Sequence, residues 1–460
     1  MRDLFMLAIL PVLLYAMAKR PFVAVGMWVW TALFFPNGWV YGPAASIRYN
    51  LLFTAVTILG YLAMKHKPTF RPGGLGVVVF VFFIWTTIST MLTIGIPEVA
   101  WEYWSRFAKT ITLFLFILLI VEKKLHVDFM LWCVVLSVGF YANLEAAKFI
   151  ASGGGHKISG MAGHALGDRN ELALAFCMTL PICYYLLSEY GKRSQVIRYG
   201  LLGTLALLVF GVVGTQSRGG FIALLMLGGY LFLKSDRKIL MGILAIGLIA
   251  VVGHLASEEY VGRINTIESA TDDASFMSRV VAWKLSFILA TQNPLFGGGF
   301  KALENFPVWV SLSRDFFSYP WFYTGDLMPN TKVARAAHSV YFQVMGDHGF
   351  VGFGLYVGIL TAAFFKAGSV ARRARKLGAD WLRTLAAMIQ LSIFAFALGA
   401  SALSFAYFDL IFALVGLVCV LEKRLLPAAV AASTRVPTPV PAPAPGTNAP
   451  VSARVKLSAR

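Results

Sequence analysis

The sequence predicts an all-α, polytopic integral membrane protein with about 12 transmembrane helices. Hydrophobic residues make up 58% of the 460 residues and charged residues only 13%, whereas a soluble domain is about 45–50% apolar and about 25% charged. Apolar runs long enough to cross a bilayer recur along nearly the whole chain. The net charge of +18 lies mainly in short loops, so it indicates membrane topology rather than nucleic-acid binding.

The apolar runs define the expected spans, which lie at about 4–18, 21–35, 47–64, 75–95, 107–121, 127–150, 170–189, 197–215, 218–233, 238–255, 338–365, 383–402 and 405–422. The first two are short and are separated only by Lys19 and Arg20. We therefore expect them to form one full span and a re-entrant or interfacial piece. The first twenty residues are faintly similar to a signal peptide, but Asp3 and the basic pair after the apolar run favour retention.

The chain divides into four expected parts: N-terminal membrane helices (1–255), a large loop domain (256–337), C-terminal membrane helices (338–426) and a disordered, Pro- and Ala-rich tail (427–460). The four cysteines, Cys133, Cys177, Cys183 and Cys419, lie inside apolar runs. We interpret them as small buried hydrophobic residues, not as disulfide or zinc ligands.

The positions of Lys and Arg predict which loops share a side of the membrane. The basic loops are 65–71, 190–198, 234–238 and 366–376, and the chain after 421–424 follows the same pattern. An even number of spans separates each from the next, so all of them are expected on the cytoplasmic side. The side on which the N-terminus lies depends on the first two segments and stays open.

The segment 256–337 is expected on the opposite side, together with 151–169 and 216–218. It carries seven basic and eight acidic side chains, so it lacks the basic excess of the other loops. It is also too long for a simple connector. We expect a large periplasmic loop that contains amphipathic helices and contributes to a functional site.

Arg218 is the strongest single candidate for a functional residue. It lies in TQSRGGFIAL (215–224), a short break between two apolar runs with no acidic residue close by in the sequence. A guanidinium at the edge of a membrane is costly unless it has a partner or a ligand. The following helix N-terminus favours an anion, and Gly219 and Gly220 would allow close approach of its backbone. The pattern predicts a phosphate-like site.

Two further stretches carry candidate residues. The stretch 276–300 predicts a helix along the membrane surface, in which Arg279 either snorkels to lipid headgroups or binds a ligand. The apolar residues that recur near helical spacing are Phe276, Val280, Trp283, Phe287 and roughly Leu289. In 335–354, His338 begins a span, where it either caps the helix or acts in chemistry. Its later glycines, Gly346, Gly349, Gly352 and Gly354, indicate close helix packing.

Asp272 and Asp273 could supply carboxylates for Mg²⁺ or Mn²⁺. They lie in the polar string ESATDDAS, which is more typical of a solvated loop. We therefore expect a site that uses no metal.

Three motifs in this order resemble the superfamily of O-antigen ligases (WaaL-type) and Wzy polymerases. They are SRGG opening a span, SRVVAWKLSFILATQNPLFGGGF, and AHSVYFQVMGDHGFVGFGLYV. The resemblance of the core covers roughly 200–365. The N-terminal pattern and GDRNELALAFCMTLPICYY (167–185) also resemble the branch of O-glycosylation ligases.

The resemblance implies a helical, GT-C-like glycosyltransferase of the bacterial inner membrane, which acts in lipopolysaccharide biosynthesis. It implies a metal-independent, inverting transfer of a glycan from undecaprenyl diphosphate to a sugar hydroxyl of lipid A-core at the periplasmic face. By matching motifs, the catalytic residues fall on Arg218, Arg279 and His338. Two arginines suit the diphosphate, and a neutral imidazole suits removal of the acceptor proton.

Neighbouring polar and aromatic residues are expected to bind the substrates. They are Gln216, Ser217, Arg263, Lys284, Trp283, Tyr341, Gln343, Arg169 and Asn170. No cofactor is expected. The alternative functions are a Wzy-type polymerase, a protein O-glycosylation ligase and, from a different class, a transporter of lipid-linked glycans. A transporter would need charge along a path through the membrane centre, whereas the notable charges here lie at one face.

Overall fold

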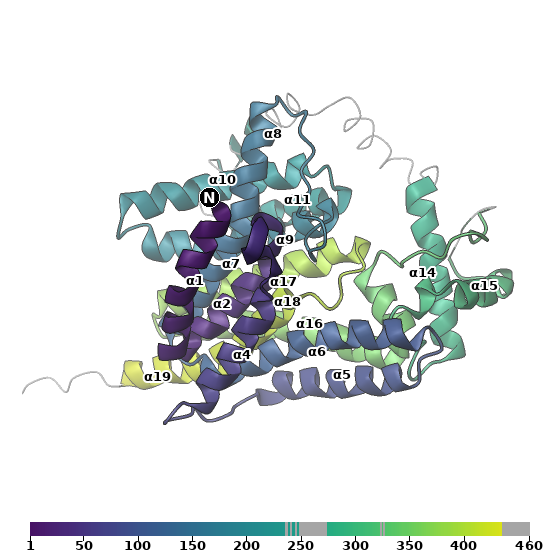
Figure 1. Ribbon diagram of the computed structural model, residues 1–460, viewed down its shortest axis with the longest axis horizontal. Coiled ribbons are helices and arrows are strands. Elements are labelled where there is room, and N and C mark those ends of the chain that lie inside the picture. Colours follow the sequence, from purple (N-terminus) through teal and green to yellow (C-terminus); the bar gives the residue numbers. More distant parts are fainter. Residues whose placement is uncertain are drawn as a thin grey trace, which may run out of the picture.

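The computed structural model describes residues 1–234, 238–239, 242–243, 246–247, 274–322, 324 and 327–434. Every regular element in this part of the chain is a helix, as Figure 1 shows. The expected all-α class is therefore confirmed for these residues. The predicted span 238–255 lies largely outside the described residues, as do Arg263, Asp272, Asp273 and the tail from 435 onward.

The N-terminal half contributes α1 (Arg2–Lys19), α2 (Pro21–Leu33), α3 (Pro36–Trp39), η1 (Gly42–Ser46), α4 (Tyr49–Leu62), α5 (Gly73–Met91), α6 (Pro97–Ile120), α7 (Lys124–Tyr141), η2 (Ala142–Ala146), α8 (Ala147–Ala151), α9 (Arg169–Tyr190), α10 (Gln195–Gly214) and α11 (Arg218–Lys234). The C-terminal half contributes α14 (Ala274–Gln292), η3 (Ala302–Glu304), α15 (Phe306–Arg314), η4 (Phe316–Ser318), α16 (Val340–Lys376), α17 (Asp380–Gly399), η5 (Ala400–Ala402), α18 (Asp409–Val420), η6 (Leu421–Leu425) and α19 (Leu426–Thr434).

Each predicted span that lies within the described residues corresponds to a helix. Seven described helices are long and apolar enough to cross a membrane, fewer than the expected count of about 12. Part of the difference lies in helices such as α2, α4 and α11, which are apolar but shorter than a full span, and the predicted span 238–255 falls largely outside the residues that were counted. At the C-terminus, α19 continues to Thr434, so the first residues of the predicted disordered tail are helical.

One end of the bundle gathers the basic loops. The guanidinium of Arg424 donates to the carbonyl of Thr69 at 3.0 Å, and the ammonium of Lys124 pairs with Glu189 at 3.0 Å and lies over the ring of Trp381. These contacts join the turns before α5, α7, α10 and α17. Four of the five predicted cytoplasmic segments therefore share one end, which we call the basic end.

The opposite end of the bundle gathers the predicted outer segments. Thr93, beyond the C-terminus of α5, donates its hydroxyl to Gly298 at 3.0 Å, and the ammonium of Lys301 lies over the ring of Tyr103 in α6. Helices α9 and α17 run between the two ends. In Figure 1, α14 and α15 lie at one extreme of the long axis and α19 at the other.

Helix α9 is the centre of the bundle. In its apolar window, 78% of the residues are buried inside the protein, compared with 28% in α10. The remaining face of α10 is apolar and outward, as expected for a helix that contacts lipid. The four cysteines are free and buried, which confirms their predicted burial.

Helix α14 forms as predicted, but its buried face differs in part from the predicted stripe. Val280 and Leu289 of the stripe are buried, but so are Met277, Val281 and Leu285, whereas Phe276 is exposed. The helix is apolar on more than one side, so its spacing pattern alone could not choose the face. Packing against α15 and α16 makes that choice.

Helix α16 is broken at Gly349, whose φ of 69° and ψ of −171° are not helical. The loop 294–299 occupies the break. Its Gly298 and Gly299 N–H groups donate to the carbonyls of Gly346 and Asp347 at 2.9 and 2.8 Å. In return, the N–H of Phe350 donates to the carbonyl of Pro294 at 2.8 Å. The loop thus replaces the helical hydrogen bond that the break removes, as buried backbone groups require.

Gly349 has a different role from the helix packing predicted for it, because it receives the loop that contains Gly297. A Cβ atom on Gly297 would lie 2.5 Å from the nitrogen of Gly349, and one on Gly349 would lie 2.6 Å from the carbonyl oxygen of Pro294. Both glycines also have positive φ, which other residues adopt only at a cost. By contrast, Gly354 has no neighbouring atom within 4 Å.

We predict that Gly297→Ala or Gly349→Ala destabilises the protein by at least about 1–3 kcal/mol, because each combines a backbone clash with an unfavourable φ. Thermal denaturation of the detergent-purified protein, followed by size-exclusion chromatography, measures this effect. Gly354→Ala is the matched control in the same helix and should be neutral or slightly stabilising. Equal melting temperatures for all three variants would contradict the structural role of the inserted loop.

Candidate functional site

The connection between α17 and α18, residues 400–408, lies at the centre of the candidate site. Its Ala402 carbonyl accepts a hydrogen bond from the Arg279 guanidinium at 3.3 Å. Its Ser404 hydroxyl accepts from the backbone N–H of His338 at 2.8 Å. Two predicted catalytic residues, which are far apart in the sequence, are thus held by neighbouring residues of one short segment.

Arg218 approaches the same connection from α11. Ser217 caps this helix, because its hydroxyl accepts from the N–H of Gly220 at 3.2 Å, so Arg218 is the first helical residue. The next residue, Gly219, packs so closely that an added Cβ would contact Ala402 and the Gly399 carbonyl, both at 3.6 Å. The α11 N-terminus and Arg279 therefore meet at Ala402.

Strained backbone marks the segments around this connection. In the described part of the chain, four non-glycine residues have positive φ. Three of them lie in these segments: Gln216 at 52°, Lys301 at 62° and His338 at 46°. Such conformations cost about 1–3 kcal/mol each and are common at functional sites. The side-chain oxygen of Gln216 is also buried without a hydrogen-bond partner.

The side chain of His338 is exposed, and its ionisation responds to the surrounding charges. Desolvation, followed by the nearby Arg279 guanidinium, lowers the pKa of His338 below its ordinary value, and Lys301 acts in the same direction. The carboxylates of Glu304 and Asp168 oppose this shift. The net effect favours a neutral imidazole, the form that can accept a proton.

Four charged residues of this region were not among the predicted site residues: Asp168, Glu171, Lys301 and Glu304. Burial alone would lower the pKa of Lys301, but its ion pair with Glu304 raises it overall. At the start of α9, burial tends to raise the pKa of Asp168, whereas hydrogen bonds, first from the N–H of Asn170, lower it overall. The sequence feature that could have indicated Lys301 is its position directly after the glycine-rich stretch Gly297–Phe300.

Most of the predicted substrate-binding residues make structural contacts. The Trp283 indole N–H donates to the Ala337 carbonyl at 2.7 Å and thereby holds the residue before His338. The Tyr341 hydroxyl donates to the Ala397 carbonyl at 2.7 Å. The Gln343 side-chain oxygen accepts from the N–H of Ala406 at 3.2 Å. These hydrogen bonds hold the backbone next to His338 and in and beside the connection 400–408.

Lys284 packs against Phe316 and not against the connection 400–408. It is 5% exposed, and its ammonium lies 4.3 Å from the centre of the Phe316 ring. Desolvation lowers the pKa of this ammonium.

Two further predicted substrate-binding residues, Arg169 and Asn170, lie at the start of α9. Asn170 donates its backbone N–H and its side-chain amide to Asp168, both at 2.8 Å.

Two other histidines of the described residues, His348 and His164, are poorly suited to act as the base. His348 is fully buried, and its Nδ1 contacts the Ser89 hydroxyl at 2.9 Å. His164 stacks on Phe35, and burial lowers its pKa to about 4. Its Nδ1 already accepts from the N–H of Leu166. His338 is the more accessible of these three side chains.

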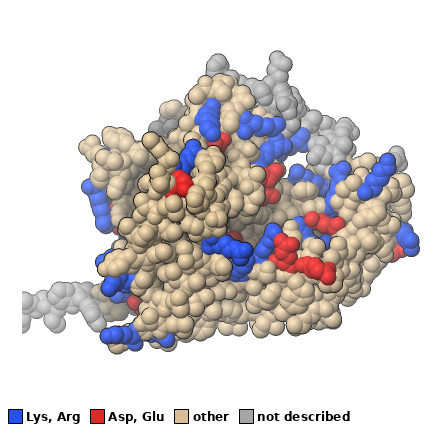
Figure 2. All heavy atoms as spheres, viewed as in Figure 1, with Lys and Arg blue, Asp and Glu red and all other residues tan. Residues whose placement is uncertain are grey.

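Within the described residues, no group of three or more His, Cys, Asp or Glu side chains could hold a metal ion. The Asp272–Asp273 pair lies outside this part of the chain. Figure 2 shows both positive and negative side chains around a hollow in the middle of the visible face.

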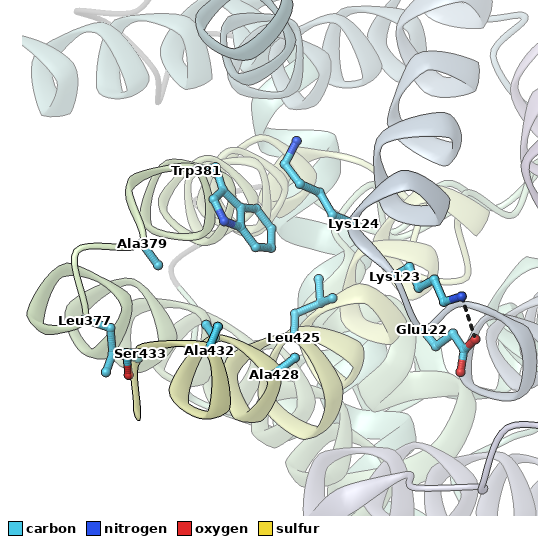
Figure 3. Close-up of a pocket in the computed structure, with 11 residues that line it drawn as sticks. Glu122, Lys123, Lys124, Leu377, Ala379, Trp381, Leu425, Ala428, Ala432 and Ser433 are labelled. Atoms are coloured by element: carbon cyan, nitrogen blue, oxygen red, sulfur yellow. Dashed lines mark ion pairs between the residues drawn. The ribbon is translucent and has the colours of Figure 1, made fainter. Parts of the chain in front are cut away.

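A separate pocket of about 470 Å³ lies at the basic end, far from the candidate site (Figure 3). The turns at 122–124 and 377–381 form two of its walls, and α19 forms the third. It is mainly apolar, and Figure 3 shows Trp381 and Leu425 facing its interior. The ammonium of Lys124 at its rim is already paired with Asp128 at 2.8 Å. None of the predicted catalytic residues lines this pocket.

Comparison with known families divides the chain into two matched regions. Residues 1–191 match a family model described as a family of unknown function. Residues 203–357 match the family model described as O-Antigen ligase. No curated protein matches the chain. The second match includes Arg218, Arg279 and His338 but not the connection 400–408. The part of the chain that carries these three residues is therefore similar to the O-antigen ligase family, which supports a ligase- or polymerase-type role in glycan assembly.

Proposed function

We propose that the protein is an O-antigen ligase: a membrane glycosyltransferase that moves a glycan from undecaprenyl diphosphate to a sugar hydroxyl of lipid A-core. The observation that carries this proposal is the convergence of Arg279, His338 and the α11 N-terminus on the connection 400–408. The Arg279 guanidinium near an accessible imidazole, together with the helix N-terminus that begins at Arg218, matches the needs of this transfer.

The two arginines bind the diphosphate of the donor. When the bond between the anomeric carbon and the diphosphate breaks, negative charge develops on the leaving phosphate oxygen. Arg218 and Arg279 can each donate two parallel hydrogen bonds to phosphate oxygens and stabilise that charge. The free N–H groups at the start of α11 would add to this binding. Undecaprenyl diphosphate then leaves with the electron pair of the broken bond.

His338 acts on the acceptor as the general base. Its neutral imidazole takes the proton from the acceptor hydroxyl as that oxygen attacks the anomeric carbon from the face opposite the diphosphate. A single displacement of this kind inverts the anomeric configuration. Arg279 favours the neutral imidazole. The residue that binds the leaving group therefore also helps to keep His338 in the form that can accept a proton.

The predicted location is the periplasmic face of the inner membrane. The candidate site lies at the end of the bundle opposite the basic end, and basic loops are retained in the cytoplasm. The donor and the acceptor are both membrane lipids, so we expect access to the site from the outer leaflet of this membrane.

The first prediction concerns what accumulates in a strain that lacks the gene. We expect unmodified lipid A-core together with lipid-linked glycan of normal length. Analysis of both fractions by gel electrophoresis and mass spectrometry makes the measurement. Core that carries single repeat units would indicate a polymerase instead, and glycan retained in the inner leaflet would indicate a transporter. Loss of glycan from protein alone would indicate an O-glycosylation ligase.

A second prediction separates the donor from the acceptor. Arg218→Lys and Arg279→Lys should weaken binding of undecaprenyl diphosphate, because lysine keeps the charge but lacks the planar fork. His338→Ala should bind it normally but lose about 10²–10⁴-fold in transfer rate. Binding is measured by microscale thermophoresis, and transfer with lipid-linked glycan extracted from the deletion strain. Normal transfer by His338→Ala would remove the histidine from the mechanism.

A third prediction concerns pH. The active form is neutral His338, so kcat/KM should fall as the pH drops through the pKa of this group, which desolvation and then Arg279 lower from its ordinary value. Arg279→Gln removes a charge that lowers this pKa, so the acid limb should move to higher pH. Glu304→Gln removes a charge that raises it, so the limb should move to lower pH. Identical profiles for the three proteins would contradict this electrostatic coupling.

A further inference from the structure

Asp347 lies at the break in α16, and its side chain joins two other segments. It is 4% exposed. One carboxylate oxygen accepts from the backbone N–H of Lys301 at 3.1 Å, and the other accepts from the Tyr407 hydroxyl at 3.0 Å. A buried carboxylate with a donor on each oxygen ties three separate parts of the chain together.

The Tyr407 ring packs against two other aromatic rings. Its ring centre lies 5.0 Å from that of Phe107 and 4.8 Å from that of Phe300. The hydroxyl therefore reaches Asp347 from a ring that is itself packed. Tyr407 also belongs to the connection 400–408, the segment that holds Arg279 through Ala402 and His338 through Ser404.

The other bond of Asp347 fixes the opposite side of the site. Lys301 has a left-handed backbone with φ of 62°, and its N–H points to the Asp347 carboxylate. Its ammonium pairs with Glu304. Since the other donor to this carboxylate is Tyr407, Asp347 links the segment of Lys301 and Glu304, whose charges act on the His338 imidazole, to the connection 400–408.

We propose that Asp347 is a positioning residue that, through its bonds to Lys301 and Tyr407, sets the distance between His338 and Arg279. This proposal rests on the proposed function, since the distance matters for placing the acceptor opposite the diphosphate. The hydrogen bonds are what position the connection 400–408. The charge of the carboxylate is not required, because each oxygen needs only one donor.

Four variants test this. Tyr407→Phe removes one hydroxyl but keeps the packed ring, and Asp347→Ala removes both bonds. Each should lower the rate constant of transfer on the order of tenfold to a hundredfold, the effect of a small misplacement of reacting groups. Asp347→Asn can still accept from Lys301 and donate to the Tyr407 oxygen, so it should recover most of the lost rate. Tyr185→Phe is the matched control, since Tyr185 is also buried and donates to a carboxylate, Asp128, at the basic end.

A second readout does not depend on activity. Nitroxide labels on Ser401→Cys and Arg335→Cys report the distance between the connection and the residues before His338. Both positions are exposed, and the native cysteines are buried. The distance distribution should be narrow in the parent protein, in Asp347→Asn and in Tyr185→Phe. It should broaden in Tyr407→Phe and Asp347→Ala, with binding of undecaprenyl diphosphate retained.

A normal transfer rate and a narrow distribution in Tyr407→Phe would overturn the proposal. So would an Asp347→Asn protein as slow as Asp347→Ala with its distribution unchanged, because the charge would then be the cause. If the parent protein transferred no glycan while the distributions still broadened as expected, the positioning role would stand and the proposed function would fail.

Discussion

The pairing of main-chain groups at the break in α16 is the constraint on which the rest of the site depends. In an apolar environment each unpaired carbonyl or N–H group costs several kcal/mol, so a helix can be interrupted only where another segment supplies its hydrogen bonds. The loop 294–299 supplies them to Gly346, Asp347 and Phe350. Side chains complete the pairing, because Trp85 donates to the carbonyl of His348 and Ser89 lies within hydrogen-bonding distance of that of Asp347.

This pairing explains why two motifs distant in the sequence belong together. The Gly297–Gly299 loop fits only where no side chain separates it from α16. Once it is in place, the next residues carry Lys301 and Glu304 towards His338. The glycines therefore contribute indirectly to the electrostatics of the candidate site. They allow the close approach that brings these charges into range.

The second organising element is the connection 400–408. It has little charge and no recognisable motif, yet it contacts α11, α14, α16 and the segment before α16. Polar backbone groups of such a turn are fixed in space by the helices on either side. The Ala402 carbonyl of this turn can therefore hold the Arg279 guanidinium in place, while the short Ser404 hydroxyl holds the backbone N–H of His338. The candidate site is thus built from charged residues on separate helices around a neutral turn.

The sequence by itself determined the helical class, most of the helix positions and the grouping of the basic loops. These features depend on local apolar runs and on charge counts, which are visible without a structure. It also indicated Arg218, Arg279 and His338 as candidates through the motifs that contain them. Only the tertiary structure could bring Arg279, His338 and the N-terminus of α11 to the connection 400–408, because the two partners of the Arg279–Ala402 hydrogen bond lie 123 residues apart in the sequence. It also showed that Lys284 packs on Phe316, that Trp283 supports Ala337, and that Gly349 breaks a helix. Residue type specifies what a side chain can bind, but the packing of distant helices decides which partner it meets.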